Sequence, residues 1–244
     1  MRLFQRDKPI EVFVRHCNYS AASAHKTRFP NFNKEHCFHN VLNTLDDPRA
    51  HVTLLLDTFH PSQEEHFIKK QSRFPVIEFK AGSEAASFLR MLEHVLHSRF
   101  SPETILYFLE DDYIHKKGWV AILREAFTLP IDYATLYDHR DKYFNYQALQ
   151  STIFHTASCH WRTTPSTTNT YAMRFETLKK HVDIHRAFSL GRTITADHDK
   201  FCKLAEEGAL LVSSLPGWAT HAEPEFASPC VDWEGVLNTT LLTK

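Results

Sequence analysis

The chain has 244 residues, of which 43% are hydrophobic and 23% are charged, and its formal net charge at pH 7 is -1. This length fits one sizeable domain, and the balanced charge argues against a nucleic-acid partner. No apolar run reaches the roughly 18 residues that cross a membrane, and the charged start does not read as a secretory signal. We therefore expect one cytoplasmic domain over 1–244, with peripheral membrane contact and oligomeric state left open.

Cysteine and glycine usage excludes several kinds of site. The five cysteines are scattered and form no C-x-x-C pair, so we expect reduced thiols and no cysteine-based zinc site. The six glycines form neither of the two common Gly-rich phosphate-binding motifs. A nucleotide, if one binds, must be held in another way.

The first half alternates between strand and helix patterns, where β-branched apolar runs predict strands and apolar residues at 3–4 spacing predict helices. Such alternation predicts a mainly parallel sheet with helices on both faces. In chain order the predicted elements are a strand at 10–16, a helix at 33–47, strands at 51–57 and 75–79, a helix at 83–99, a strand at 104–109, a helix at 118–129 and a strand at 133–138.

The second half is predicted to be richer in β-structure. Residues 151–174 are rich in threonine and aromatic residues, which favours short hairpin segments attached to the sheet. Helices are expected at 175–188 and 197–208, followed by a strand at 209–215. The tail from 216 onward contains proline and tryptophan and reads as irregular.

Acidic residues end three of the predicted strands: Asp57, the triplet 110–112, and Asp138. Ligands of open α/β sheets bind at the carboxyl ends of the strands. Single acids there also serve as ordinary helix caps, and that reading stays open for Asp57 and Asp138. Three consecutive carboxylates repel one another, so we expect a hard divalent ion, Mn²⁺ or Mg²⁺, to compensate them. Alternation along an extended segment would direct Glu110 and Asp112 to one side.

The apolar strand ending in "LEDD" and followed by "GW" and a helix resembles the D-x-D-type motif of nucleotide-sugar-dependent glycosyltransferases of the glycosyltransferase-A fold. The resemblance implies one α/β domain with a nucleotide-sugar-binding half at about 1–130 and an acceptor-binding half at about 131–244. It makes Asp112 the metal ligand and Glu110 the partner on the ribose side. Because the motif here is E-D-D, the roles of Glu110 and Asp111 in nucleotide binding are not separated.

Further positions follow from the same resemblance. Arg15 and His16 come after the first strand, where the family binds base and ribose, and Asp57 matches a position that contacts the base. Gly82 and Ser83 begin the helix that lies along the nucleotide. The late histidine, His221, would complete the metal site, although a surface histidine is the alternative.

The resemblance also implies a catalytic base at the start of a helix in the second half. Asp197 is the preferred candidate and Asp199 the alternate, while helix N-capping is the structural alternative for both. An inverting transferase needs such a carboxylate to remove the proton of the acceptor hydroxyl. Trp161 and Arg162 are expected to bind the acceptor by stacking and hydrogen bonding, unless they belong to a plain edge strand.

The function expected from this pattern is a metal-dependent glycosyltransferase of polysaccharide biosynthesis that moves a sugar from a UDP- or GDP-sugar to a carbohydrate or other hydroxyl acceptor. Three alternatives remain. A nucleotidyltransferase of related architecture is disfavoured because such enzymes usually carry a Gly-rich basic loop after the first strand, and "RHCNYSAASAHK" contains no glycine. A metal-dependent phosphoesterase would need more converging acids, and a non-catalytic carbohydrate-binding protein would need none.

Overall fold

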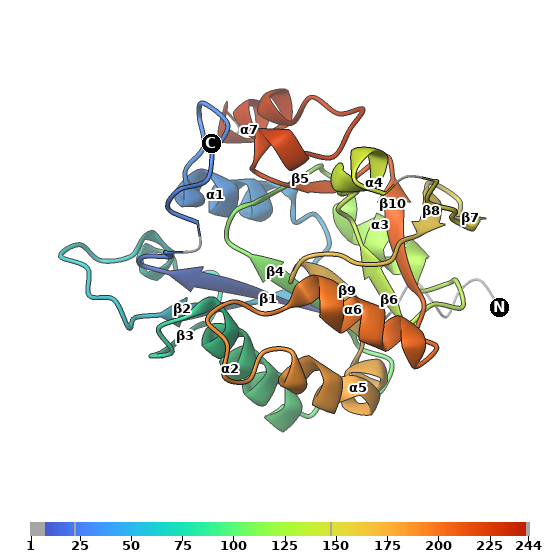
Figure 1. Cartoon of the computed structure of the whole chain (residues 1–244). Helices are drawn as coiled ribbons and strands as arrows, with labels where there is room; N and C mark the ends of the chain where they lie inside the picture. The colour runs from blue at the N-terminus through green and yellow to red at the C-terminus, as the bar shows by residue number, and fades with distance from the viewer. Residues whose placement is uncertain (1–7, 22, 147, 243–244) are drawn as a thin grey trace.

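A nine-stranded sheet runs through the part of the chain that the computed structural model describes, residues 8–21, 23–146 and 148–242 (Figure 1). The strand order is β3-β2-β1-β4-β9-β6-β10-β8-β7. The strands are β1 (Ile10–Cys17), β2 (Ala50–Asp57), β3 (Val76–Phe79), β4 (Ile105–Glu110), β6 (Tyr133–Thr135), β7 (Ile153–His155), β8 (His160–Thr163), β9 (Tyr171–Arg174) and β10 (Leu211–Leu215).

The first half of the sheet is parallel, as the sequence predicts. β1 pairs in parallel with β2 and β4, and β3 pairs in parallel with β2. β9 enters antiparallel between β4 and β6, and β7 and β8 form an antiparallel hairpin at the far edge. The expected α/β class, with a mainly parallel sheet and a second half richer in antiparallel strands, is confirmed.

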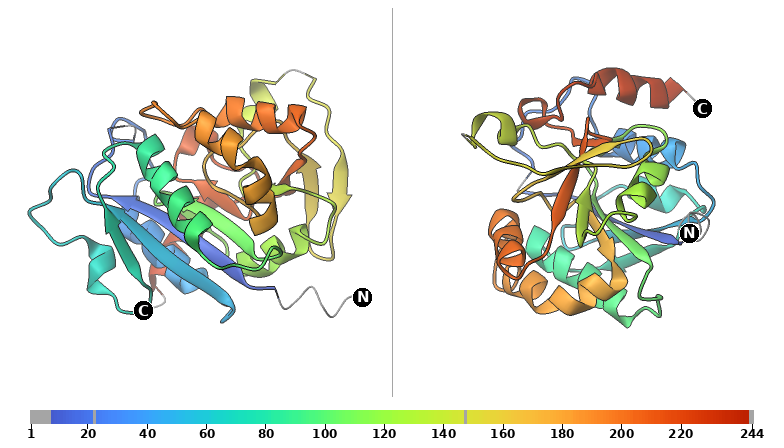
Figure 2. Two further views of the ribbon diagram at one scale, coloured as in Figure 1. Left: turned by 90° about the horizontal axis from the view of Figure 1, so that it is seen from below. Right: turned by 90° about the vertical axis from the view of Figure 1, so that its right-hand side faces the viewer.

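Helices cover both faces of the sheet (Figures 1 and 2). On one face α2, α5 and α6 pack around Phe13, Leu106 and Tyr171. On the other face α1 and α3 pack around Val12, Leu54 and their neighbours, and α7 lies outside α1. The helices are α1 (Lys34–Thr44), α2 (Glu84–His97), α3 (Trp119–Ala126), α4 (Asp141–Phe144), α5 (Phe175–Ala187), α6 (Asp197–Glu206) and α7 (Trp233–Leu242), with 3₁₀ turns at Phe67–Lys70 and Pro224–Phe226.

Two helix starts have the caps that their sequences indicate. The side chain of Asn33 accepts a hydrogen bond from the backbone N–H of His36, and that of Ser83 accepts one from Ala86. Such caps satisfy amide groups that have no partner within the helix. They set the position of α1 and α2, whose first turns face the carboxyl ends of the parallel strands.

The prediction of an irregular tail is wrong. Residues 219–221 form β11 (Ala219–His221), which pairs antiparallel with β5 (Tyr113–His115), and α7 follows. The side chain of Asn40 in α1 also holds β5. Its amide nitrogen donates to the carbonyl oxygen of His115, and its amide oxygen accepts a hydrogen bond from the backbone N–H of His115. Backbone pairing across roughly a hundred residues therefore orders this tail. None of the helices in the described ranges is both long and apolar enough to span a bilayer.

Candidate active site

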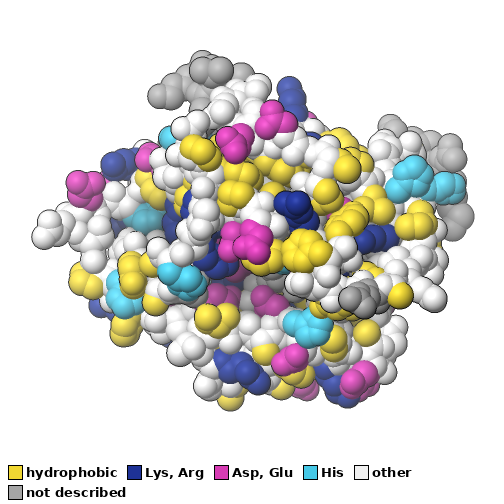
Figure 3. Space-filling view, turned by 45° about the horizontal axis from the view of Figure 1, so that its top comes forward, with side chains coloured by type: hydrophobic (Ala, Val, Ile, Leu, Met, Phe, Trp, Pro, Cys, Tyr) yellow, Lys and Arg dark blue, Asp and Glu magenta, His cyan; other side chains and the backbone are white. Residues whose placement is uncertain are grey.

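The acidic triplet after β4 is compensated by basic side chains rather than left exposed as one block of negative charge. Each carboxylate faces a cation from a different segment of the chain, and Arg15, which faces Glu110, lies closer to Glu84. The pairs are Glu110 with Arg15 at 3.5 Å, Asp111 with Lys34 at 2.7 Å, and Asp112 with Arg28 at 2.8 Å. In the space-filling view, acidic and basic side chains lie against one another near the middle of one face (Figure 3).

Asp112 lies directly against His221 because two short strands bring them together. Tyr113 of β5 is in register with His221 of β11, and the backbone N–H of Ala222 donates to the carbonyl oxygen of Asp112 at 2.9 Å. The His221 Nε2 to Asp112 Oδ2 distance is 2.8 Å. The two residues that the resemblance assigns to the metal therefore form one contact, although they are far apart in sequence.

Burial and charge act in opposite directions on this pair. Burial opposes ionisation of Asp112, but the charges of His221 and Arg28 outweigh it and hold the pKa of Asp112 well below its usual range. Burial likewise lowers the pKa of His221, but the Asp112 carboxylate raises it to about 9. A raised pKa favours the protonated ring, which donates a hydrogen bond from each nitrogen, and Nε2 must lose its proton before it can coordinate a cation.

The second ring nitrogen of His221 faces Glu223. Nδ1 lies 3.2 Å from Glu223 Oε2, and Lys26 approaches the same carboxylate oxygen at 3.1 Å. The hydrogen bond from His221, assisted by Lys26, lowers the pKa of Glu223 to about 2. A carboxylate on Nδ1 fixes the orientation of the ring, as the outer partner of a metal-binding histidine commonly does.

The donor chemistry of Asp112 and His221 suits a divalent cation. Two neighbouring ligands of an octahedral ion, each at about 2.1 Å, stand about 3 Å apart, which is close to their separation of 2.8 Å. Among the described residues, no group of three or more His, Cys, Asp or Glu side chains gathers to hold a metal. A cation here would complete its coordination sphere with oxygen atoms of water and of a bound substrate, as Mg²⁺ commonly does.

Glu110 lies between the Asp112 pair and the start of α6. Its carboxylate accepts a hydrogen bond from the Thr170 hydroxyl at 3.4 Å as well as facing Arg15. Burial raises the pKa of Glu110 to about 8, Arg15 counteracts this, and the charges of Asp112 and Asp197 add to it. Arg15 contacts both Glu110 and Glu84, and Glu84 accepts a hydrogen bond from the backbone N–H of Thr195, so the acidic segment and the turn before Asp197 are connected.

Asp197 and Asp199 at the start of α6 have different environments. Asp199 is exposed, whereas the side chain of Asp197 is only 26% exposed and lies 3.3 Å from the fully buried ammonium of Lys200. Burial raises the pKa of Asp197 to about 6, although Lys200 acts against the rise. A carboxylate with a pKa close to neutral pH is suited to act as a general base.

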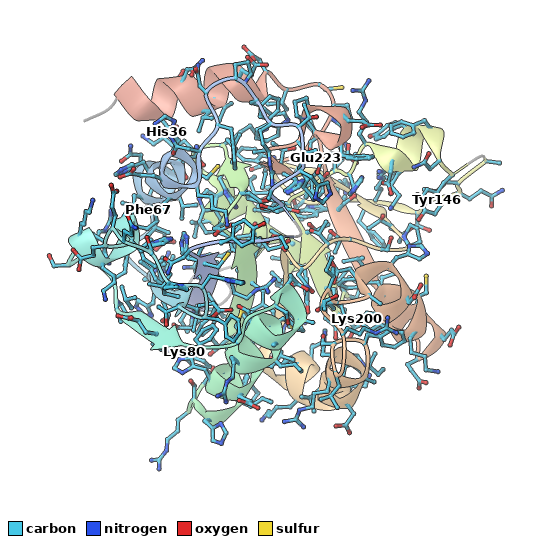
Figure 4. All side chains as sticks on the ribbon, turned by 60° about the vertical axis from the view of Figure 1, so that its left-hand side comes forward. His36, Phe67, Lys80, Tyr146, Lys200 and Glu223 are labelled. Atoms are coloured by element: carbon cyan, nitrogen blue, oxygen red, sulfur yellow. The ribbon has the colours of Figure 1, made fainter. Side chains whose placement is uncertain are left out.

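A buried network positions the start of α6 against α2. Glu84 forms a 2.8 Å ion pair with Arg15 and accepts hydrogen bonds from the Thr195 backbone N–H and the Asn169 amide, both at 2.8 Å. Asn169 in turn accepts a hydrogen bond from Lys200 at 2.5 Å. Glu84 and Lys200 thus connect β1, α2 and α6, and Figure 4 labels Lys200 on α6.

Arg15 and His16, the residues expected to bind base and ribose, point to opposite faces of β1, as neighbouring strand residues do. Arg15 faces α2 and the acids described above. His16 is 1% exposed, lies among aromatic rings that include Phe38 and Phe67, and burial keeps its pKa well below the usual value. The expectation that His16 contacts a nucleotide is wrong for this structure because its ring is enclosed in the core.

Asp57, Gly82 and Ser83 do lie together beyond the ends of β2 and β3, but their hydrogen bonds are internal. The Asp57 carboxylate accepts backbone hydrogen bonds from Phe59, Ala81 and Gly82 at 2.8–3.0 Å, and Ser83 caps α2. Asp57 therefore orders the turn before α2. Gly82 has a φ of 82°, which favours glycine.

The prediction that Trp161 and Arg162 bind the acceptor is wrong, because both side chains are buried. Trp161 is 0% exposed within the core, so no face of its ring is free to stack on a sugar. Arg162 is also buried, and it donates to Asp138 at 2.7 Å, whose other oxygen accepts a hydrogen bond from Tyr143. Both side chains support β8 and the neighbouring strands rather than an open acceptor surface.

Sequence reasoning missed six charged residues of this site: Lys26, Arg28, Lys34, Glu84, Lys200 and Glu223. No local signal distinguishes Arg28 or Lys34 from ordinary surface cations, because their partners lie 84 and 77 residues away. Glu84 is the first residue of α2, where an acid is common, and Lys200 is the fourth residue of an amphipathic helix, where its sequence position gives no sign of burial. The fully buried state of Lys200 becomes visible only in the folded chain.

The comparisons with known proteins support the architecture. No family model and no curated protein sequence matches the chain. It is similar to a solved CMP:2-keto-3-deoxy-manno-octonic acid synthetase complexed with CTP, with a TM-score of 0.53 and 13% identity over 96% of this chain and 99% of that one. It is also similar to a nucleotidyl transferase from Methanothermobacter thermautotroptrophicus, with a TM-score of 0.47 and 14% identity over 97% of this chain and 99% of that one. A third similar structure is S. aureus TarS 1–349, with a TM-score of 0.48 and 15% identity over 96% of this chain and 66% of that one.

At these identities the likeness shows the fold alone. The expected architecture is confirmed as a single α/β domain with a mainly parallel sheet and helices on both faces, which the CMP:2-keto-3-deoxy-manno-octonic acid synthetase shares.

Proposed function

We propose that this protein is a nucleotide-sugar-dependent glycosyltransferase that moves a sugar, with inversion, from a nucleoside-diphosphate sugar to a hydroxyl acceptor. The observation that carries the proposal is the contact between Asp112 and His221 beyond β4, with Arg15 and Glu84 connecting this acidic segment to the turn that precedes Asp197. This is the edge of an open α/β sheet where ligands bind.

The donor half of the reaction is assigned to the acidic segment. Asp112 and His221 would hold a divalent cation, Mn²⁺ or Mg²⁺, which when bound offsets the charge of the departing nucleoside diphosphate. Arg15 and Lys34 supply further positive charge beside Glu110 and Asp111. Glu110 is proposed to accept a hydrogen bond from the ribose.

Asp197 is proposed as the general base. It takes the proton from the acceptor hydroxyl while that oxygen forms its bond to the anomeric carbon and the bond to the diphosphate breaks. Lys200, buried beneath Asp197, holds the carboxylate in place. Glu84 positions the same turn through the backbone N–H of Thr195.

A nucleotidyltransferase is the second candidate, because the CMP:2-keto-3-deoxy-manno-octonic acid synthetase with CTP shares the architecture over nearly the whole chain. Such an enzyme joins a nucleoside triphosphate to a sugar and releases pyrophosphate. The segment that follows β1, residues 18–33, contains no glycine and so lacks the Gly-rich loop typical of that class.

A ligand panel separates the two candidates. Thermal shifts with Mn²⁺ plus nucleoside diphosphates, diphosphate sugars or triphosphates show which class stabilises the protein, since a bound ligand raises stability according to its concentration over its dissociation constant. Any donor that binds is then tested for release of nucleoside diphosphate or of pyrophosphate.

Two variants make the test specific to the site. Asp112→Asn is expected to abolish the metal-dependent shift. Asp197→Asn is expected to keep the shift but lower transfer by about 10²-fold or more, with the exposed Asp199→Asn as its matched control. Release of pyrophosphate from a triphosphate, with no diphosphate sugar bound, would reject the glycosyltransferase.

A further inference from the structure

The guanidinium of Arg28 lies beside the atoms that the proposed function assigns to the cation. Its Nη2 donates to Asp112 Oδ2 at 2.8 Å, and its Nη1 lies 3.3 Å from His221 Nε2. One cationic group therefore faces both proposed metal ligands at once. The Arg28 side chain is 12% exposed, so it is enclosed in the site rather than extended into solvent.

Neighbouring contacts hold the backbone at Arg28 in place. Phe29 is buried in a cluster with Ile114, Ala222 and Trp233. The guanidinium lies over the ring of Phe32, 4.7 Å from its centroid. Phe29 thus anchors the segment, and Phe32 adds a cation–π contact to the guanidinium beside Asp112.

Arg28 contacts Asp112 more closely than it contacts His221. His221 Nε2 and Arg28 Nη2 both approach the same oxygen, Oδ2 of Asp112, at 2.8 Å. When His221 Nε2 donates to that oxygen, the 3.3 Å approach of Arg28 Nη1 to Nε2 brings two donors together and is not a hydrogen bond. Arg28 is then held at the pair by one carboxylate oxygen.

We propose that Arg28 and a divalent cation compete for the Asp112 carboxylate, so that the guanidinium occupies the position beside Asp112 and His221 from which the cation must displace it. A divalent ion coordinated by both residues would lie within a few ångströms of the guanidinium, where like charges repel strongly. The inference rests on the proposed function, in which Asp112 and His221 hold the cation. It adds that Arg28 sets how tightly that cation binds.

The test measures Mn²⁺ binding alone, without nucleotide, by the loss of the free-ion signal in electron paramagnetic resonance. Arg28→Gln removes the competing charge and is expected to bind Mn²⁺ about tenfold or more tightly than the wild type, the effect of losing one charge-assisted hydrogen bond. Arg90→Gln is the matched control, because it removes the same group from an exposed ion pair with Glu93. It should bind Mn²⁺ as the wild type does.

A double variant locates the gain in affinity. Arg28→Gln combined with Asp112→Asn should lose the added Mn²⁺ binding, and near-ultraviolet circular dichroism checks that each variant is folded. If Arg28→Gln does not fold, Arg28→Lys replaces it, because it keeps the charge but offers no planar fork, and weaker competition should again tighten Mn²⁺ binding.

Equal Mn²⁺ affinity in the wild type and in the folded Arg28 variant overturns the competition, as does a gain that survives Asp112→Asn. A failure of the proposed function gives a different result. In that case Arg28→Gln still gains Mn²⁺ affinity, but no member of the nucleotide panel binds.

Discussion

Replacing Asp197 with asparagine should stabilise the protein at neutral pH while it removes the proposed base. Burial raises the pKa of Asp197 from its ordinary value of 3.8 to about 6. A raised pKa means that the folded state favours the protonated, neutral form, so ionisation costs stability. At about 1.4 kcal/mol per pKa unit the penalty is about 3 kcal/mol, and partial solvent exposure reduces it to about 2 kcal/mol.

The sign of this effect defines the pH window. Well below pH 3.8 the Asp197 carboxyl is protonated in both the folded and the unfolded state, so it costs no stability. This cost grows as the pH rises and reaches its full value above about pH 6. The asparagine side chain of the Asp197→Asn variant cannot ionise, so the variant should equal the wild type near pH 4 and exceed it by about 2 kcal/mol near pH 8.

Urea denaturation followed by circular dichroism at pH 4.5, 6 and 8 measures the difference. Asp199→Asn is the matched control, because Asp199 lies on the same first turn of α6 but is exposed. It should change stability little at any of these pH values. An Asp197→Asn protein that is less stable than the wild type at pH 8 would refute the burial argument, and with it the reason for choosing Asp197 as base.

Three further predictions concern neighbouring features. Arg162→Leu leaves the buried carboxylate of Asp138 without its cation and should lower the free energy of unfolding in urea by about 3 kcal/mol; a change below about 1 kcal/mol would contradict a structural role. His221, whose pKa is raised to about 9, contributes stability below pH 6.5 that is lost as pH rises through 9, so His221→Gln should remove that decline from thermal unfolding curves. Gly82→Ala forces a side chain into a φ of 82° and should cost about 1 kcal/mol or more in urea unfolding; an unchanged midpoint would mean that the turn relaxes.

The sequence alone predicted most of the sheet and its helices, because these depend on local patterns. The apolar runs of β1, β2 and β4 and the capped starts of α1 and α2 lie within one or two residues of their predicted positions. The errors fall where pairing is long-range. β5 is three residues long and β11 is another three, and neither has a pattern that stands out until the two strands meet.

The position of the acidic triplet and of the late histidine could be read from the sequence, but their partners could not. Glu110, Asp111 and Asp112 follow a buried strand and must therefore reach the edge of the sheet. Which charge meets each of them depends on how the chain closes over some 80 to 100 residues, and no local periodicity encodes that closure. The sequence argued for a metal ion as the compensating charge, whereas the folded chain brings basic side chains to all three acids.

Burial separates the remaining site residues in a way that only the tertiary structure decides. Arg15 and His16 are adjacent in β1, yet Arg15 faces Glu84 and Glu110 whereas the His16 ring is buried on the opposite face, 3.8 Å from Asp111, because strand neighbours point to opposite faces. Trp161 offers an aromatic ring in the sequence, but the packing of β8 encloses it. Residue type and spacing determined which chemistry the chain carries, and the packing of distant segments decided which of those groups meet in one site.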